Sequence, residues 1–364
     1  MKASLEGILD EVARGSRRLT DDEALICFTE APLSLLFWKA DIVRRRLHGT
    51  RTTFIIDRNI NYTNICEMRC AFCAFSRDEG DADAYVLTHD EVLERVREAA
   101  DLGATQVMIQ GGLYRKTGLF YVTELFRKLK TEFPHITNHS LSAAEIDYFA
   151  RTEGLSLEET VRVLKEAGLD SLPGAGAEIL NDEVRTIISP KKIGTRRWLD
   201  VHRAVHEAGL FSTATMVIGH VEAPKHRVAH LKAIRDLQDE TGGFRSFIPW
   251  IYLPGKTELG GTKATASEYL RTIAVARLYL DNVPHVQASW LTVGRKVGQL
   301  ALHAGADDLG SLMLEENVVR ATGHDFVALR TDEMVSLIES AGFTAAQRRT
   351  DFSIVTEYAP RMPA

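Results

Sequence analysis

Long apolar runs are missing from this sequence of 364 residues. The most apolar stretch near the N-terminus, residues 31–38, is much shorter than the roughly 20 residues that a helix needs to cross a bilayer. Residues 1–22 mix acidic and basic side chains and lack the apolar core of a secretory signal. We therefore expect no membrane span and a cytoplasmic location.

An excess of basic side chains is missing as well. The chain carries 44 Lys and Arg against 50 Asp and Glu, for a formal net charge of −6. Such a balance offers little to neutralise phosphates, so we expect no nucleic-acid partner. The 45% hydrophobic and 26% charged content is typical of a globular protein with a large core. A small-molecule substrate suits this composition better.

Cysteine is scarce, with four residues in the whole chain, which is too few for a disulfide scaffold. Three of them, Cys66, Cys70 and Cys73, nevertheless fall within eight positions of each other. In a reducing compartment, such clustering indicates metal binding or catalysis.

Apolar, β-branched segments alternate with charged segments of helical periodicity along the chain. Capping boxes mark three helix starts, because a hydroxyl and a carboxylate three residues apart satisfy free backbone N–H groups reciprocally. The boxes are Thr88/Glu91, Ser156/Glu159 and Thr265/Glu268. The expected strands are residues 53–60, 105–109, 136–141, 169–172, 212–218, 244–250 and 286–290, with a weaker one near 306–309.

Repeated strand–helix units require parallel strands, and we predict an α/β fold with a (β/α) TIM-type barrel over residues 51–330. Residues 1–50 are expected to form an N-terminal helical cover. Residues 331–364 are expected to form a C-terminal extension, with a helix at 332–341 and a strand at 353–357. A doubly wound open sheet is the alternative. In such barrels the chemistry lies at the C-terminal ends of the strands, so motifs that follow strands are the candidates for a site.

The most specific motif is a CxxxCxxC run, Cys66 to Cys73, directly after the first expected strand. Thiolates are the usual ligands of iron–sulfur clusters, which normally have four of them. Three ligands from one loop would leave one iron open. Zinc is the alternative, although structural zinc normally has four ligands, often as two separated cysteine pairs.

This spacing, with an aromatic residue just before the last cysteine, resembles the radical S-adenosylmethionine superfamily. The resemblance implies a 4Fe–4S cluster whose open iron binds the methionine end of S-adenosylmethionine. One electron from the cluster would then cleave the sulfonium and give a 5′-deoxyadenosyl radical. Phe72 would lie against the adenine, or alternatively pack beneath the loop.

By the same resemblance, groups at the strand ends contact the cofactor. Gln110, Gly111 and Gly112 follow the second strand, where the family has a glycine-rich turn whose backbone receives the cofactor's amino group. Glycine permits such a close approach, although an ordinary turn is the alternative. The other expected cofactor contacts are Ser142, Glu145, Glu178 and Glu222.

Longer motifs are similar to the group of menaquinone (futalosine pathway) and deazaflavin synthases within this superfamily. They are residues 57–64, 176–179, 239–244 and 281–284, while residues 254–261, 287–290 and 313–319 are most similar to the members that cyclise dehypoxanthinyl futalosine. The resemblance implies hydrogen abstraction from the ribose C4′, attack on the benzoate ring, and loss of a proton and an electron. The alternatives are an aminofutalosine synthase, a deazaflavin (FO) synthase, or a metal-binding protein that is not an enzyme.

The substrate implied by this resemblance, dehypoxanthinyl futalosine, has a carboxylate, which a guanidinium can bind through both oxygens. Arg58 and Arg295 are candidates by their positions near strand ends, with structural salt bridges as the alternative. His220 is a third candidate for substrate binding. Asp57, His220 and Glu222 are the candidates for the deprotonating base. The family further implies a flavodoxin- or ferredoxin-type reductant.

Two histidine pairs and one basic run have simpler interpretations. The pairs have an i,i+4 spacing that can bind zinc, but they lack the glutamate that a metalloprotease motif has after its first histidine. We interpret them as solvated or packed histidines on outer helices, and the basic run as a solvated face. The residues are His202/His206, His226/His230 and Lys191, Lys192, Arg196 and Arg197.

Overall fold

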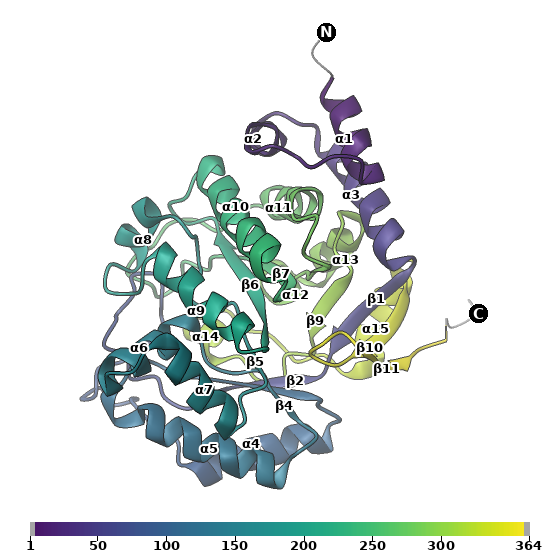
Figure 1. Ribbon diagram of the computed structural model, residues 1–364. Helices are drawn as coiled ribbons and strands as arrows, with labels where there is room; N and C mark the ends of the chain where they lie inside the picture. The colour runs from purple at the N-terminus through teal and green to yellow at the C-terminus, as the bar shows by residue number, and fades with distance from the viewer. Residues whose placement is uncertain (1–3, 360–364) are drawn as a thin grey trace.

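A computed structural model describes residues 4–359, and parallel strands form its centre (Figure 1). β1 (Arg51–Ile55) leads directly into β2 (Asp57–Asn61). The strands that follow are β3 (Gln106–Gln110), β4 (Thr137–Asn138), β5 (Ser171–Leu172), β6 (Phe211–Ile218), β7 (Phe244–Ile251), β8 (His285–Val286) and β9 (Asp308–Ser311).

Hydrogen bonds close these strands into a barrel. β2, β3 and β4 pair in parallel, as do β5, β6, β7 and β8. Single bridges from His139 to Ser171 and from Gln287 to Asp308 connect these groups to each other and to β9. Because β9 also pairs with β1, the ring is complete. The predicted TIM-type barrel is confirmed, and the doubly wound alternative is wrong, since an open sheet would leave two unpaired edges.

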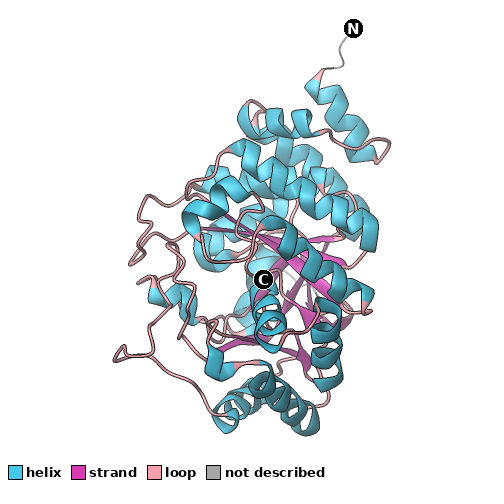
Figure 2. Cartoon of the chain, turned by 60° about the vertical axis from the view of Figure 1, so that its left-hand side comes forward, coloured by secondary structure: helices cyan, strands magenta, loops and turns pink. Residues whose placement is uncertain are grey.

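Helices surround the strands (Figure 2). The three predicted capping boxes are all formed, at the starts of α4, α7 and α11. No helix in residues 4–359 is both long and apolar enough to cross a membrane. The bounds are α4 (His89–Asp101), η1 (Arg115–Thr117), α5 (Leu119–Glu132), α6 (Ala143–Glu153), α7 (Leu157–Ala167), α8 (Asp182–Ile188), α9 (Thr195–Glu207), α10 (Pro224–Thr241), α11 (Ala266–Tyr279), α12 (Trp290–Val293), α13 (Arg295–His303), α14 (Asn317–Ala321) and α15 (Thr331–Ser340).

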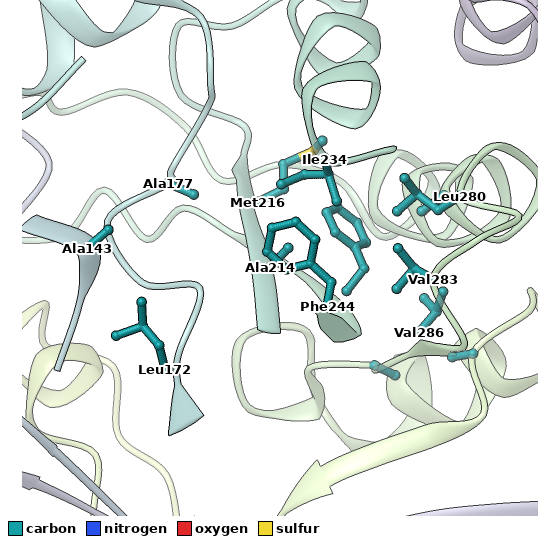
Figure 3. Close-up of a cluster of buried hydrophobic side chains, with 14 of the residues drawn as sticks. Ala143, Leu172, Ala177, Ala214, Met216, Ile234, Phe244, Leu280, Val283 and Val286 are labelled. Carbon is teal, nitrogen blue, oxygen red and sulfur yellow. The ribbon is translucent and has the colours of Figure 1, made fainter. Parts of the chain in front are cut away.

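The hydrophobic core lies between the barrel wall and the helices. Successive side chains of a strand point to opposite faces, so one strand serves both the core and the barrel interior. In β6, Ala214 and Met216 are fully buried in the core, whereas Thr215 and Val217 line cavities inside the barrel. Figure 3 shows Ala214 and Met216 in this layer, together with Ile234 from α10.

Three N-terminal helices, α1 (Leu5–Arg14), α2 (Asp21–Thr29) and α3 (Leu33–His48), pack against α10 and α11 (Figure 1). The fully buried Arg44 of α3 donates hydrogen bonds to the carbonyl groups of Gly49, Arg51 and Ala306. These carbonyl groups lie where β1 and β9 begin, so α3 is fixed to the end of the barrel opposite the expected site. The domain boundaries at residues 50 and 330 stay predictions.

Several expected strands are shorter in the structure. The segment 53–60 is interrupted at Ile56, and the weaker segment 306–309 is β9. The segment 136–141 keeps only two strand residues and a single bridge at His139, and the backbone leaves the extended region at Leu141, whose φ is 67°. Likewise, the segment 286–290 ends at Val286, and Trp290 already belongs to α12.

β10 (Thr344–Arg348) is a strand that the sequence pattern does not predict. It pairs in parallel with β1 and antiparallel with β11 (Ile354–Glu357), which corresponds to the expected strand at 353–357. Of the five residues in β10, only Thr344 is β-branched, so the intrinsic preference for a strand is weak. The partner strands on both sides compensate for this weakness.

Candidate active site

The three clustered cysteines lie on the long loop that follows β2. Cys70 is buried, Cys66 and Cys73 are partly exposed, and all three line one cavity. The backbone N–H of Cys66 donates to the carbonyl of Arg77, and that of Cys73 donates to the carbonyl of Cys70. Ala71 connects the loop to the rest of the site, because its N–H donates to the Ile188 carbonyl and its own carbonyl accepts from Leu259.

The cysteine geometry fits an iron–sulfur cluster better than a single metal ion. Among residues 4–359, one set of three His, Cys, Asp or Glu residues has its ligand atoms all within 4.8 Å of one another, namely His48, His285 and Asp307. The sulfur atoms of the three cysteines do not meet this distance, so they lie farther apart. A tetrahedral zinc ion would hold its sulfurs about 2.3 Å from itself and hence close together. Burial raises the pKa of the Cys70 thiol to about 12, so binding as a thiolate requires a metal partner.

Gly111 and Gly112 lie directly against the cysteine loop, as the glycine-rich turn requires. A Cβ atom on Gly112 would lie 2.1 Å from the carbonyl oxygen of Ile65 and 2.8 Å from Cys66 Cβ. A Cβ atom on Gly111 would lie 2.5 Å from the ring of Tyr62. The absence of side chains here allows the end of β3 to approach the loop. The neighbouring Gln110 donates through Nε2 to the Leu141 carbonyl.

Glu145 connects this turn to the start of α6. Its Oε1 accepts hydrogen bonds from the Tyr62 hydroxyl at 2.8 Å and from Gly111 N–H at 3.0 Å. Its Oε2 accepts from the Ser142 hydroxyl at 2.7 Å. Burial raises the pKa of Glu145 to about 7, against the lowering effect of these donors. Both expected cofactor contacts, Ser142 and Glu145, therefore lie together in the cavity wall.

Glu178 forms a buried ion pair next to the cysteines. Its carboxylate accepts from Lys192 at 3.0 Å and lies 3.5 Å from Arg185. Burial opposes its ionisation, but the two cations outweigh burial and hold the pKa of Glu178 below its usual value. Lys192 Nζ also lies 5.6 Å from the centre of the Phe72 ring. Phe72, Glu178 and Lys192 all line the cavity.

The interpretation of the basic run as a solvated face is wrong for Lys192, whose side chain is 15% exposed. Its charge is neutralised by Glu178 inside the site, which the sequence pattern could not reveal. Lys191 and Arg196 are exposed as expected, and Arg197 pairs with Asp147. In the histidine pairs, His202, His206 and His230 are buried and packed, and His226 is partly buried.

His220 and Glu222 follow β6 but line neither cavity of the barrel. Glu222 accepts from the N–H groups of Gly219 and His220, at 2.7 and 2.9 Å, and from Arg227 at 2.6 Å. These hydrogen bonds hold the turn after β6, and the expected cofactor contact of Glu222 stays a prediction. Burial lowers the pKa of His220, which packs near Tyr252.

Arg58 and Arg295 also lie away from the cavities. Arg58 donates to Glu315 at 2.7 Å and to Glu98 at 2.5 Å, as the salt-bridge alternative predicts. Arg295 is about half exposed and its nearest carboxylate, Glu333, is 3.6 Å away. The side chain of Arg58 points outward from β2, away from both cavities, and the assignment of Arg58 to the substrate stays a prediction.

Two adjoining cavities occupy the C-terminal end and the interior of the barrel. The upper cavity, of about 290 Å³, contains the cysteines and the residues just described. The lower cavity, of about 120 Å³, lies among the strands and includes Asp57, whose pKa is raised by burial. Six residues line both cavities: Asn59, Gln110, Ala175, Thr215, Trp250 and Glu316.

Several polar atoms at these cavities are buried without a hydrogen-bond partner in the described part of the chain. They are Asn59 Oδ1, Asn61 Oδ1, Trp250 Nε1, Thr292 Oγ1 and Thr350 Oγ1. Buried polar groups normally have partners, so these atoms are suited to a polar ligand. Asn59 and Asn61 belong to the family motif at residues 57–64, but none of these residues was predicted as a site residue.

Comparisons with known proteins agree with this geometry. Residues 60–234 match the Radical SAM superfamily, and residues 241–359 match the CofH/MqnC C-terminal region. A cyclic dehypoxanthine futalosine synthase of Streptomyces coelicolor is 48% identical over 96% of this chain and 89% of its own length. One of Halalkalibacterium halodurans is 41% identical over 98% and 96%.

Proteins with other names are also similar, one in sequence and one in fold. A 5-amino-6-(D-ribitylamino)uracil–L-tyrosine 4-hydroxyphenyl transferase of Methanopyrus kandleri is 41% identical over 86% of this chain and 87% of its own length. The FeFe-hydrogenase maturase HydG from Carboxydothermus hydrogenoformans superposes with a TM-score of 0.76 at 17% identity, over 96% of this chain and 81% of HydG. The chain therefore belongs to the radical S-adenosylmethionine superfamily, in the group with a CofH/MqnC C-terminal region, and is an enzyme that uses a 4Fe–4S cluster and S-adenosylmethionine.

Proposed function

We propose that this enzyme converts dehypoxanthinyl futalosine to its cyclic form in menaquinone biosynthesis. The observation that carries the proposal is the contact between the two cavities. The upper cavity contains the three cluster ligands, and the lower cavity is enclosed by strands. A radical formed in the upper cavity can therefore react with a substrate in the lower cavity, away from water. The near full-length similarity to the two cyclic dehypoxanthine futalosine synthases supports this choice of substrate.

When bound, the cluster and S-adenosylmethionine supply a 5′-deoxyadenosyl radical, which takes the C4′ hydrogen of the substrate ribose. The carbon radical then attacks the benzoate ring, and loss of a proton and an electron restores aromaticity. Cys66, Cys70 and Cys73 hold the cluster in this proposal. A protein of flavodoxin or ferredoxin type supplies the electron, and the partial exposure of Cys66 and Cys73 makes the cluster loop accessible to it.

The remaining residues of the upper cavity orient the cofactor. Lys192 is the only lysine, arginine or histidine among the described residues that line it, so we assign it to the methionine carboxylate. The turn around Gly111 and the side chain of Glu145 face the cofactor's amino group, and Phe72 faces the adenine. Gln110, Ser142 and Glu178 support these contacts through the hydrogen bonds described above, and Gly112 through its close approach to the cysteine loop.

Anaerobic reconstitution with iron and sulfide, followed by reduction with S-adenosylmethionine present, tests this function. With dehypoxanthinyl futalosine we expect 5′-deoxyadenosine and a product that is two hydrogens lighter than the substrate. The competing substrates are 5-amino-6-(D-ribitylamino)uracil with L-tyrosine. If this pair, and not dehypoxanthinyl futalosine, stimulated 5′-deoxyadenosine formation, the proposal would be wrong.

A further inference from the structure

Glu316 occupies the boundary between the two cavities. Of the six residues that line both, it alone has a carboxylate, and none of the other five has an ionisable side chain. The position is chemically significant because a substrate in the lower cavity must present its reacting carbons toward the upper one. A proton released at that point is therefore released near Glu316.

The surroundings of Glu316 fix its carboxylate in place. The residue is 4% exposed and caps the short helix α14, with Oε1 accepting from Val318 N–H at 3.0 Å and Val319 N–H at 3.3 Å. Oε2 accepts from the side-chain amide of Asn59 at 2.7 Å. Burial, with a contribution from the nearby Asp57, raises the pKa of Glu316, which favours uptake of a proton.

The other carboxylates at the cavities are engaged differently. Glu178 is held ionised by Lys192 and Arg185. Glu145 lines only the upper cavity, where three donors hold it against the Gly111 turn. Asp57 lines only the lower cavity, where Ser311 and Gln106 donate to its two oxygens. None of these three lies at the boundary.

We propose that Glu316 accepts the aromatic proton when the cyclised ring recovers its aromaticity, an inference that rests on the proposed cyclisation. The ribose C4′ forms a bond to a ring carbon, and the C–H bond of that carbon then breaks. The proton goes to the Glu316 carboxylate, and both electrons of the C–H bond return to the ring. One electron then leaves to a one-electron acceptor of the iron–sulfur class.

The test is Glu316→Gln in the reconstituted enzyme. Glutamine can still cap α14 through its carbonyl oxygen, and Asn59 can turn its unpartnered Oδ1 toward the new amide. We expect substrate binding, measured by calorimetry without S-adenosylmethionine, to stay within about threefold of wild type. Single-turnover 5′-deoxyadenosine should still form, whereas cyclised product should fall by about 100-fold or more, the effect typical of losing a general base. Deuterium on the reacting ring carbon should slow the variant more than the wild type.

Glu315→Gln is the matched control, because the neighbouring carboxylate pairs with Arg58 and Arg95 and lines neither cavity. It should form product at the wild-type level. Near-normal product from Glu316→Gln would overturn the proposal, as would a parallel fall in product and 5′-deoxyadenosine, which indicates a binding role. If the wild type itself does not cyclise dehypoxanthinyl futalosine, the proposed function fails and the role of Glu316 fails with it.

Discussion

At the scale of single residues, the contact between Gly112 and the cysteine loop leads to a prediction about cluster binding. In Gly112→Ala, the new methyl group would meet the Ile65 carbonyl and Cys66 Cβ, neither of which can move without shifting the loop. We expect the iron and sulfide content after reconstitution to fall well below that of wild type. Gly80→Ala is the control in the same loop, because a Cβ there meets nothing within 4 Å. Equal iron content in both variants would contradict the prediction.

Arg58 gives a second prediction at this scale. Arg58→Gln removes its ion pairs with Glu315 and Glu98 but leaves both cavities unchanged. We expect the free energy of unfolding to fall by about 1 kcal/mol, as is usual for partly exposed pairs. The KM for dehypoxanthinyl futalosine should remain within about twofold of wild type. A tenfold higher KM would show instead that Arg58 binds the substrate carboxylate.

These residues also show what the sequence could reveal about the site. The cysteines were predicted from their spacing, whereas the Gly111–Gly112 turn, Ser142, Glu145 and Glu178 were predicted from the resemblance to the radical S-adenosylmethionine superfamily. The barrel brings these strand ends together. The direction in which a side chain points was not predictable in this way. Arg58 also lies near the end of a strand, but its side chain points away from the cavities. Lys192 and Glu316 were missed because their importance depends on partners distant in sequence, Glu178 and Asn59.

At the scale of elements, β10 shows that pairing with neighbouring strands can determine where a strand forms. Long strands rich in β-branched residues, such as β6, or in aromatic residues, such as β7, were predicted nearly residue by residue. β4 and β8 are so short that only their neighbours define them. β10 lacks a strong local preference, and no periodicity in a single sequence indicates that it will lie beside β1.

The ion pair between β10 and β9 therefore carries an element-scale prediction. Asp308 is fully buried and accepts two hydrogen bonds from Arg348 and one from Thr53. Arg348→Met should lower the free energy of unfolding by about 3–5 kcal/mol, because it leaves a buried carboxylate without its cation. Urea titration measures this loss.

Two further variants test the cause of that loss. The double variant Arg348→Met/Asp308→Asn should lose less stability than Arg348→Met alone, because the uncompensated charge is gone. Arg349→Met, at the neighbouring exposed position, should change stability by less than about 0.5 kcal/mol. If Arg348→Met behaved like Arg349→Met, the arrangement of β9 and β10 on the two sides of β1 would not depend on the ion pair.

At the scale of the whole molecule, buried histidines make the fold sensitive to acid. Burial lowers the pKa of the buried His139, His206 and His230 and of the partly buried His48. The pKa is about 4 for His48 and His206 and about 3 for His139 and His230. Below about pH 6.5 the unfolded chain takes up protons on these residues and the folded chain does not, so stability falls as the pH falls. The raised pKa values of the carboxyl groups of Glu145, Asp57 and Glu316 act in the opposite direction, because these groups take up protons in the folded chain first.

His230→Gln isolates one of these contributions. His230 is fully buried, and its Nδ1 accepts a hydrogen bond from Leu180 N–H at 2.9 Å, which a glutamine carbonyl can also accept. Between pH 7.5 and pH 5 the wild type should lose about 2 kcal/mol more stability than the variant, since one site of unfolded pKa near 6.5 contributes about that amount. Urea titrations at each pH measure the difference. His135→Gln, at an exposed position, should follow the wild-type slope, and if His230→Gln did so too, the acid sensitivity would have to come from other groups.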